Sequence, residues 1–299
     1  YIGDDCAYLK ELGLVVTQDS LVEDIHFSLK YMSPYQIGYK SAKVNISDIN
    51  ASGGISKYMS VALSLPNKID NQFIEDFYKG LKDASGDIEI IGGDITGSDK
   101  IVVSITLIGI DKGRKISSRK NAKTEYVIVT EGYYGSSAGG LELLKKGSYI
   151  QHKLIDAHTM PEANQNLSKL IAENIKTNYA MMDTSDGLVD ALYKIAVSSG
   201  KTIIIDFSKI KYLNELKEIF PLEYKNMMLY GGEDYNVVAA IPKTFAKKYE
   251  LNIIGDVTDQ KQYPLKFVNF DNSEKEKGKM IIGDLPHLIN NKFKESNFR

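Results

Sequence analysis

The sequence has a single cysteine, Cys6, among its 299 residues. One cysteine excludes a disulfide within the chain and a zinc site of the cysteine-rich kind. It fits a reducing compartment, and we expect a cytoplasmic protein. Long apolar runs are also missing, since the longest, at 101–110, is too short to cross a bilayer and contains Ser104 and Thr106. The first residues of this sequence are acidic, and no basic, apolar leader is visible in them. Because the sequence starts at Tyr1 and not at Met, a leader or another N-terminal segment remains an open alternative.

The chain has little excess of charge of either sign. It carries 37 Lys and Arg against 39 Asp and Glu, which gives a net charge of -2. This balance does not favour binding to nucleic acid or to a membrane surface by bulk electrostatics. The composition is 43% hydrophobic and 25% charged, which is typical of a globular protein. At roughly 100–200 residues per domain, the length favours two domains.

The common signatures of nucleotide-binding and hydrolytic enzymes are absent. The sequence contains no G-x-x-x-x-G-K-[ST] loop, no G-x-G-x-x-G after a strand, no H-E-x-x-H and no G-x-S-x-G. If the protein binds a nucleotide, it therefore does so through a different type of binding site.

The first 110 residues alternate strand and helix patterns. Ser33-Pro34 is typical of a helix start, and Gly53-Gly54 is typical of its end. A second helix is predicted from the apolar face that includes Phe73 and Phe77. Strands are predicted at 14–17, 58–65, 88–91 and 101–110. A basic loop at 112–123 follows, and we place a domain boundary there, giving domains 1–112 and 113–299.

The second half also mixes helix and strand patterns. Strands are predicted at 126–130, 202–205, 235–241, 253–255 and 265–268, and helices at 137–146, 162–176 and 188–197. We therefore expect an α/β (α+β) protein, with a ferredoxin-like N-terminal sheet bearing helices and a mixed α+β C-terminal domain.

Carboxylates placed beside glycine are the most distinctive pattern. They occur in Gly3-Asp4-Asp5, Gly92-Gly93-Asp94, Asp183-Thr184-Ser185-Asp186-Gly187 and Gly231-Gly232-Glu233-Asp234, and further aspartates lie at Asp19 and Asp48. We expect the 88–91 strand to end at its glycines, where a loop can aim a carboxylate at a ligand. Each motif alone is also compatible with an ordinary turn or helix N-cap. Likewise His26 alone could be a structural hydrogen-bonding residue, Cys6 a small core residue, and the basic loop a solvated connection.

Taken together, the motifs favour a cation site. Four or more carboxylates that converged on one place would repel one another and need a cation between them. Oxygen ligands without His or Cys suit Mg²⁺, which commonly binds carboxylates together with substrate phosphates. With Arg119 and a helix start at 185–187, the pattern suggests a Mg-nucleotide site, provided that the motifs meet in the fold.

The segments GDDCAYL, QDSLVEDIHF, YKSAKVNISDINASGG, IIGGDIT, SSRKNAK, DTSDGLVDAL and GGEDYNV, in this order, resemble the thiamine-monophosphate kinase family. That family belongs to the superfamily of aminoimidazole ribonucleotide (AIR) synthetase. The resemblance implies N- and C-terminal domains of the AIR-synthase type, and a homodimer that pairs through the N-terminal domains. It also implies Mg²⁺-dependent transfer of the ATP γ-phosphoryl group to thiamine monophosphate, with several Mg²⁺ ions.

The same resemblance assigns roles to individual residues. The implied metal ligands are Asp5, Thr17, Asp19, Asp48, Asp94, Asp183 and Asp186. Arg119 and Ser185 match ATP-contacting positions, and His26 and Glu233 match positions that hold thiamine monophosphate. A C-terminal aromatic, Phe298 in preference to Phe293, is expected to stack near thiamine. Asp48, Asp94 and Arg119 are expected to matter most for catalysis, while Gln18 departs from the family's usual Thr.

Two alternatives remain at this point. The first is another Mg-ATP enzyme of the superfamily: AIR synthetase itself, selenophosphate synthetase or the hydrogenase-maturation ATPase. The second is a nucleotide-binding protein without catalysis, which would be expected to have lost a metal carboxylate or Arg119, yet all of these are present.

Overall fold

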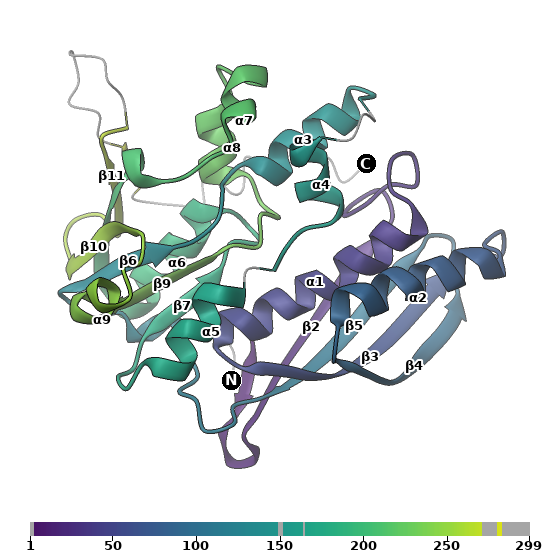
Figure 1. Ribbon diagram of the computed structural model, residues 1–299, viewed down its shortest axis with the longest axis horizontal. Coiled ribbons are helices and arrows are strands. Elements are labelled where there is room, and N and C mark those ends of the chain that lie inside the picture. Colours follow the sequence, from purple (N-terminus) through teal and green to yellow (C-terminus); the bar gives the residue numbers. More distant parts are fainter. Residues whose placement is uncertain (1–2, 149–151, 164, 271–279, 283–299) are drawn as a thin grey trace.

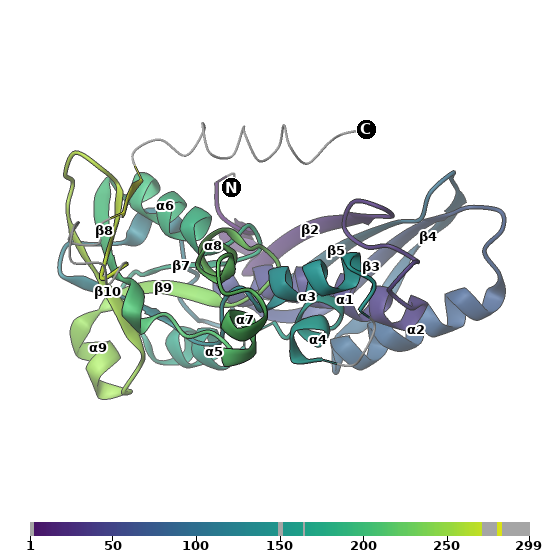
Figure 2. The same ribbon diagram turned by 90° about the horizontal axis from the view of Figure 1, so that it is seen from above.

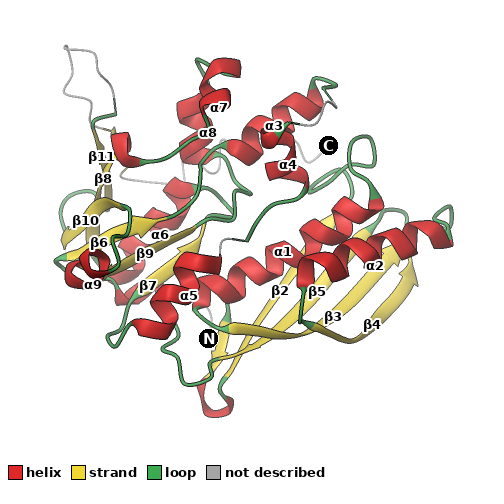
Figure 3. Cartoon of the chain, viewed as in Figure 1, coloured by secondary structure: helices red, strands yellow, loops and turns green. Residues whose placement is uncertain are grey.

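The computed structural model describes residues 3–148, 152–163, 165–270 and 280–282. They form two β-sheets with helices packed against them, as Figures 1 and 3 show, so the expected α+β fold class is confirmed. Helix α1 (Pro34–Ser52) lies where the two halves meet, in contact with elements of both. Within the described ranges, no helix has the length and apolar character needed to cross a membrane.

The N-terminal sheet has the strand order β1-β2-β5-β3-β4. Its strands are β1 (Ala7–Leu9), β2 (Leu14–Val22), β3 (Ile55–Leu65), β4 (Glu89–Gly97) and β5 (Val102–Ile110). Helices α1 and α2 (Asn71–Ser85) cover one face of this sheet, and the described helices leave its other face uncovered (Figure 2). Alternate strand residues such as Val61 and Leu63 are buried beneath the two helices.

Helix α1 begins and ends where its sequence predicts. The Ser33 hydroxyl accepts from the Gln36 backbone N–H and the Gln36 side chain accepts from the Ser33 N–H, which forms a capping box ahead of Pro34. Gly53 ends the helix at φ 83°, a left-handed conformation that glycine adopts without strain. Because α1 lies between the two halves, it buries polar side chains as well as apolar ones.

The C-terminal sheet has the strand order β12-β11-β8-β10-β6-β9-β7. Its strands are β6 (Tyr126–Thr130), β7 (Ala180–Asp183), β8 (Lys201–Asp206), β9 (Val237–Pro242), β10 (Ile253–Asp259), β11 (Leu265–Val268) and β12 (Met280–Ile282). The helices of this half are α3 (Ser136–Lys145), α4 (Lys153–Thr159), α5 (Gln165–Asn174), α6 (Leu188–Ser199), α7 (Asn214–Ile219), α8 (Tyr224–Tyr230) and α9 (Lys243–Lys248). Short 3-10 turns occupy Lys10–Leu12, Arg119–Asn121 and Phe207–Lys209. Each face of this sheet has its own buried cluster, and edge strand β7 contacts α1.

Two expected strand ends are wrong. Strand β4 does not end at Gly92 and Gly93 but runs through them and Asp94 to Gly97. The glycines allow a close approach of two backbones, since a Cβ atom at Gly93 would collide with the Val61 carbonyl on β3. Strand β2 likewise continues past the predicted end at Thr17 and contains Asp19.

Candidate active site

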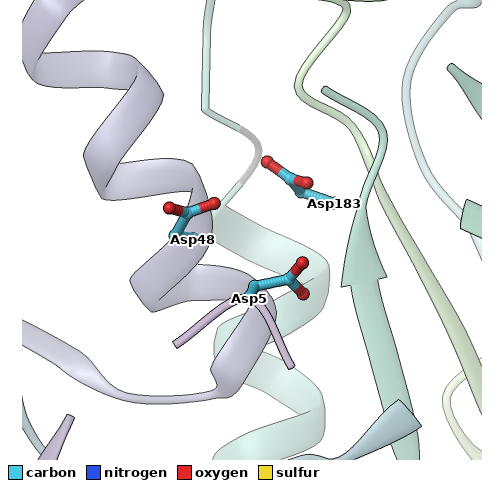
Figure 4. Close-up of side chains that lie close together, drawn as sticks. All are labelled: Asp5, Asp48 and Asp183. Atoms are coloured by element: carbon cyan, nitrogen blue, oxygen red, sulfur yellow. The ribbon is translucent and has the colours of Figure 1, made fainter. Parts of the chain in front are cut away.

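Three carboxylates from distant parts of the sequence meet where α1 passes the end of β7. Asp5 lies in the N-terminal turn, Asp48 on α1, and Asp183 is the last residue of β7. One carboxylate oxygen from each lies within 4.8 Å of the others. Figure 4 shows the three side chains facing a common space. The convergence on which the predicted cation site depended is therefore present for these three residues, which we call the carboxylate cluster.

Hydroxyl groups from both halves fix the carboxylate cluster. Thr17 Oγ1, on β2, donates to Asp48 Oδ2 at 2.5 Å. Ser47 Oγ, on α1, donates to Asp183 Oδ2 at 2.7 Å, and Ser185 Oγ donates to Asp183 Oδ1 at 2.9 Å. Each donor stabilises the ionised form of its carboxylate and fixes its direction.

The cluster lacks enough positive charge to balance its own carboxylates. Burial, then the charge of Asp183, raises the pKa of Asp5 to about 7 despite Arg119 nearby. Burial and the neighbouring Asp183 and Asp19 hold the pKa of Asp48 well above its usual value. Burial also raises the pKa of Asp183. A bound divalent cation would reverse these shifts, and a set made only of hard oxygen donors fits Mg²⁺.

Asp19 borders the cluster from strand β2. Burial, followed by the charges of Asp183 and Asp186, raises its pKa to about 6, and it forms a side-chain hydrogen bond with Asp48. Its backbone N–H donates to Asn45 Oδ1 on α1 at 3.1 Å, which ties β2 to the helix. The structure therefore brings Asp19 beside the three clustered carboxylates.

Arg119 forms an ion pair with Asp5 of the cluster. Its Nη2 donates to Asp5 Oδ1 at 2.5 Å, and its backbone N–H donates to Asp4 Oδ1 at 2.7 Å. Ser118 donates to the other oxygen of Asp4 at 2.8 Å, so the two N-terminal aspartates hold this loop in place. The buried Nε of Arg119 has no hydrogen-bond partner in the described part of the chain. A guanidinium in this state can still donate to an anionic ligand.

Asp186 and Asp94 do not join the carboxylate cluster within one chain. Asp186 is 68% exposed and pairs with Lys194 of α6 at 3.2 Å, although its charge contributes to the raised pKa of Asp19. Asp94 lies on edge strand β4, in register with the exposed Ala62 of β3. Since paired residues share a face, Asp94 points to the face of the sheet opposite α1. Asp186 also is not a helix cap, because Gly187 occupies that position.

A second polar group forms around Glu233, on the loop before β9. Lys40 Nζ, from α1, lies 3.1 Å from Glu233 Oε2, and His158 Nδ1, from α4, lies 3.4 Å from the same oxygen. Burial lowers the pKa of the nearby His26, whose Nδ1 accepts from the Val22 backbone N–H. His26 and Glu233, both predicted as substrate residues, are thus placed near one another.

Lys40, Ser47 and His158 were not predicted as site residues from the sequence. Lys40 and Ser47 had no clear signal, because α1 mixes polar and apolar residues along its whole length. His158 had none beyond the scarcity of histidine, of which the chain has four. Cys6 is buried, as expected of a core residue. Phe298 and Phe293 lie outside the described residues.

Comparisons with known proteins agree with this arrangement. The family described as AIR synthase related protein, N-terminal domain, matches residues 3–110. Thiamine-monophosphate kinase of Bacillus subtilis (strain 168) is 37% identical over 253 residues, covering 80% of this chain and 77% of that protein. The same enzyme of Aquifex aeolicus (strain VF5) is 36% identical over 256 residues, covering 81% of each.

Solved structures show the same likeness. A structure described as AaThiL complexed with AMPPCP and TMP is 32% identical, covers 93% of this chain and 91% of its own, and has a TM-score of 0.81. A HypE–HypF complex, at 19% identity and a TM-score of 0.70, shares the fold. With relatives this similar over most of its length and the carboxylate cluster in place, the chain belongs to the thiamine-monophosphate kinase family.

Proposed function

We propose that this protein transfers the γ-phosphoryl group of ATP to thiamine monophosphate, giving thiamine diphosphate, and that the reaction requires Mg²⁺. The observation that carries the proposal is the meeting of Asp5, Asp48 and Asp183 beside Arg119. The names of the relatives and the ThiL complex with AMPPCP and TMP support the two substrates.

The chemistry needs charge neutralisation more than a base. The acceptor is a phosphate oxygen that is already anionic near neutral pH, so no side chain has to remove a proton from it. Bound Mg²⁺ would supply the positive charge that lets two polyanions approach in line. The carboxylates act as its scaffold, and the proposed ligands are Asp5, Thr17, Asp19, Asp48, Asp94, Asp183 and Asp186.

Arg119 and Ser185 would hold ATP at the edge of the carboxylate cluster. The unpartnered Nε of Arg119 leaves donor capacity for a phosphate oxygen, and the charge of its guanidinium would stabilise the transferring group. Ser185 lies in the turn between β7 and α6, next to Asp183. His26 and Glu233 would bind thiamine monophosphate, with Phe298 stacking on it.

We also propose a homodimer formed through the uncovered face and edge of the N-terminal sheet. Edge strand β4 exposes Ile91 and Ile95, which are 57% and 54% accessible, and β3 exposes Tyr58. Apolar side chains on an unpaired edge strand favour association. Asp94 lies on this same strand, so in a dimer it would serve a site that includes the partner chain.

The division into domains 1–112 and 113–299 is part of the proposal. It is supported by the two sheets, because β5 ends the first at Ile110 and β6 begins the second at Tyr126. A cytoplasmic location stays a prediction based on the single cysteine.

The test is a direct assay of the protein with ATP, MgCl₂ and thiamine monophosphate, with thiamine diphosphate and ADP measured by chromatography. We expect one ADP per thiamine diphosphate, and no product without Mg²⁺. Asp48→Asn should lose activity by about 100-fold or more, because a metal ligand is lost. Asp256→Asn is the matched control, since that aspartate is exposed on β10 and should leave the rate unchanged. ATP binding without thiamine diphosphate formation would overturn the substrate assignment and favour another enzyme of the superfamily.

A further inference from the structure

Lys40 is a lysine with no access to solvent. It lies in the first half of α1, and its side chain is 0% exposed. Its ammonium group lies 3.1 Å from Glu233 Oε2 and donates to the His26 backbone carbonyl at 3.5 Å. Burying an ammonium costs free energy that only a partner of opposite charge offsets, so a lysine is seldom kept in this position. Packing alone therefore does not explain why a buried lysine is paired with Glu233 at this position.

The two oxygens of Glu233 have different surroundings. Oε2 faces Lys40 and also lies 3.4 Å from His158 Nδ1. Among the described residues, no hydrogen bond or ion pair reaches Oε1, and the Glu233 side chain is 27% exposed. The carboxylate is thus fixed through one oxygen and leaves the other open to a ligand.

His158 contributes to this arrangement as a neutral ring. Burial and the charge of Lys40 lower its pKa to about 2, so the ring carries no charge at neutral pH. We assign its proton to Nδ1, because a bare Nδ1 would set its lone pair against the carboxylate oxygen. The ring then offers an N–H towards Glu233, close to the Ser137 hydroxyl at 3.1 Å.

We propose that Lys40 is a positioning residue that holds Glu233 in a fixed orientation through Oε2, with His158 in support, so that Oε1 accepts from the exocyclic amino group of the substrate. This inference rests on the proposed function, because thiamine monophosphate carries an exocyclic amino group on its pyrimidine ring. An ionised carboxylate can only accept hydrogen bonds, so a fixed Glu233 selects for a donor or a cation. Lys40 would act on substrate affinity and not on the phosphoryl transfer step.

The test compares Lys40→Met, Glu233→Gln and the double variant with the unmodified protein. In Lys40→Met we expect the KM for thiamine monophosphate to rise about tenfold or more, with the KM for ATP and kcat within about twofold. The double variant should be no worse than Glu233→Gln alone, because Lys40 acts through Glu233. Lys43→Met, three residues further along α1 and half-buried, is the control and should keep both KM values.

Three outcomes distinguish the proposals. A multiplicative loss in the double variant, or an equal rise of both KM values in Lys40→Met, would show a merely structural lysine and overturn the positioning role. If Lys40→Met is too unstable to assay, the double variant, which removes both charges, decides by the same comparison with Glu233→Gln. An unmodified protein that makes no thiamine diphosphate would overturn the proposed function instead.

Discussion

Ser47 and Asp183 lie 136 positions apart in the chain and are joined by a 2.7 Å hydrogen bond from the serine hydroxyl to Oδ2. The bond connects α1, which packs on the first sheet, to β7 at the edge of the second. Both residues are almost fully buried, so the bond forms in a setting where a missing donor cannot be replaced easily by water.

Removing this donor should weaken the site as well as the fold. Ser47→Ala leaves Asp183 with Ser185 as its remaining side-chain donor, so we expect a loss of about 1–3 kcal/mol in the free energy of unfolding. We also expect Mg²⁺ to stabilise the Ser47→Ala variant less than it stabilises the unmodified protein. Urea denaturation with and without MgCl₂ measures both effects. Ser41→Ala is the control, because that buried hydroxyl bonds only the Ile37 carbonyl on the same helix; equal Mg²⁺ effects in the two variants would contradict the prediction.

We expect the carboxylate cluster to lower the stability of the metal-free protein and, at the same time, to be required for activity. In the metal-free protein, Asp48→Asn removes one buried like charge, so we expect the free energy of unfolding to rise by about 1 kcal/mol or more at pH 8. The same variant should lose both activity and the stabilisation by Mg²⁺. Calorimetric melting in EDTA and in MgCl₂ tests this. A metal-free variant less stable than the unmodified protein would count against the interpretation that the carboxylates repel one another.

The stability of the metal-free protein should fall as pH rises. The folded pKa of Asp5 is about 7 and that of Asp19 about 6, while unfolded carboxyls titrate near 3.8. Between these values the folded protein holds more protons than the unfolded chain, so the free energy of unfolding decreases from about pH 4 to about pH 7.

Mg²⁺ should reverse this trend, because it binds the ionised carboxylates and competes with protons. Its stabilising effect should be largest above pH 7 and lost as pH falls below about 6. Denaturation curves at several pH values, with EDTA or MgCl₂, give the change of the unfolding free energy with pH for the metal-free and the Mg²⁺-bound protein. Asp5→Asn should make the unfolding free energy of the metal-free protein depend less on pH. A Mg²⁺ effect that does not change with pH would exclude these groups as the ligands.

Arg119 should be needed as a guanidinium and not only as a positive charge. Arg119→Lys keeps the charge but loses the fork that reaches Asp5, so we expect kcat/KM for ATP to fall by about 10- to 1000-fold. Arg114→Lys is the control, since that arginine pairs with Glu173 away from the cluster and should change the rate by less than twofold. Steady-state kinetics with varied ATP is the measurement, and similar losses in both variants would contradict a specific role.

The exposed edge of the first sheet should determine the oligomeric state. A lysine in place of Ile95 would put a charge on β4, so Ile95→Lys should turn a dimer into a monomer and reduce activity with it. Leu222→Lys, at a residue that is 86% exposed in the other half, should do neither. Light scattering after size exclusion gives the mass. An unmodified protein that is monomeric at assay concentrations would overturn the proposed dimer.

Local sequence signals predicted much of the fold. The start and end of α1 followed from Ser33, Pro34 and Gly53, because capping is decided within a few residues. The wrong end of β4 came from treating Gly92 and Gly93 as a turn, whereas pairing with β3 carries the strand through them. Tertiary pairing of this kind leaves no signal in the glycines themselves.

The candidate site shows the same limit. The motifs marked Asp5, Asp48 and Asp183, but only the fold shows that these three meet while Asp94 lies on the opposite face. Lys40 went unnoticed because a lysine on a helix ordinarily faces water, and its partner Glu233 lies 193 positions away. Contacts between residues so far apart in the sequence depend on how the two halves of the chain pack together. A short sequence pattern cannot predict that packing.

The carboxylate cluster takes two of its members from the first half of the chain and one from the second. Neither half holds all three carboxylates, so the proposed cation site would exist only while the two halves are docked. A cation bound there would therefore hold the two halves together, because its binding free energy would oppose their separation. Proteolytic nicking of the connection between Ile110 and Tyr126 would then leave two fragments held together in Mg²⁺ and released by a chelator.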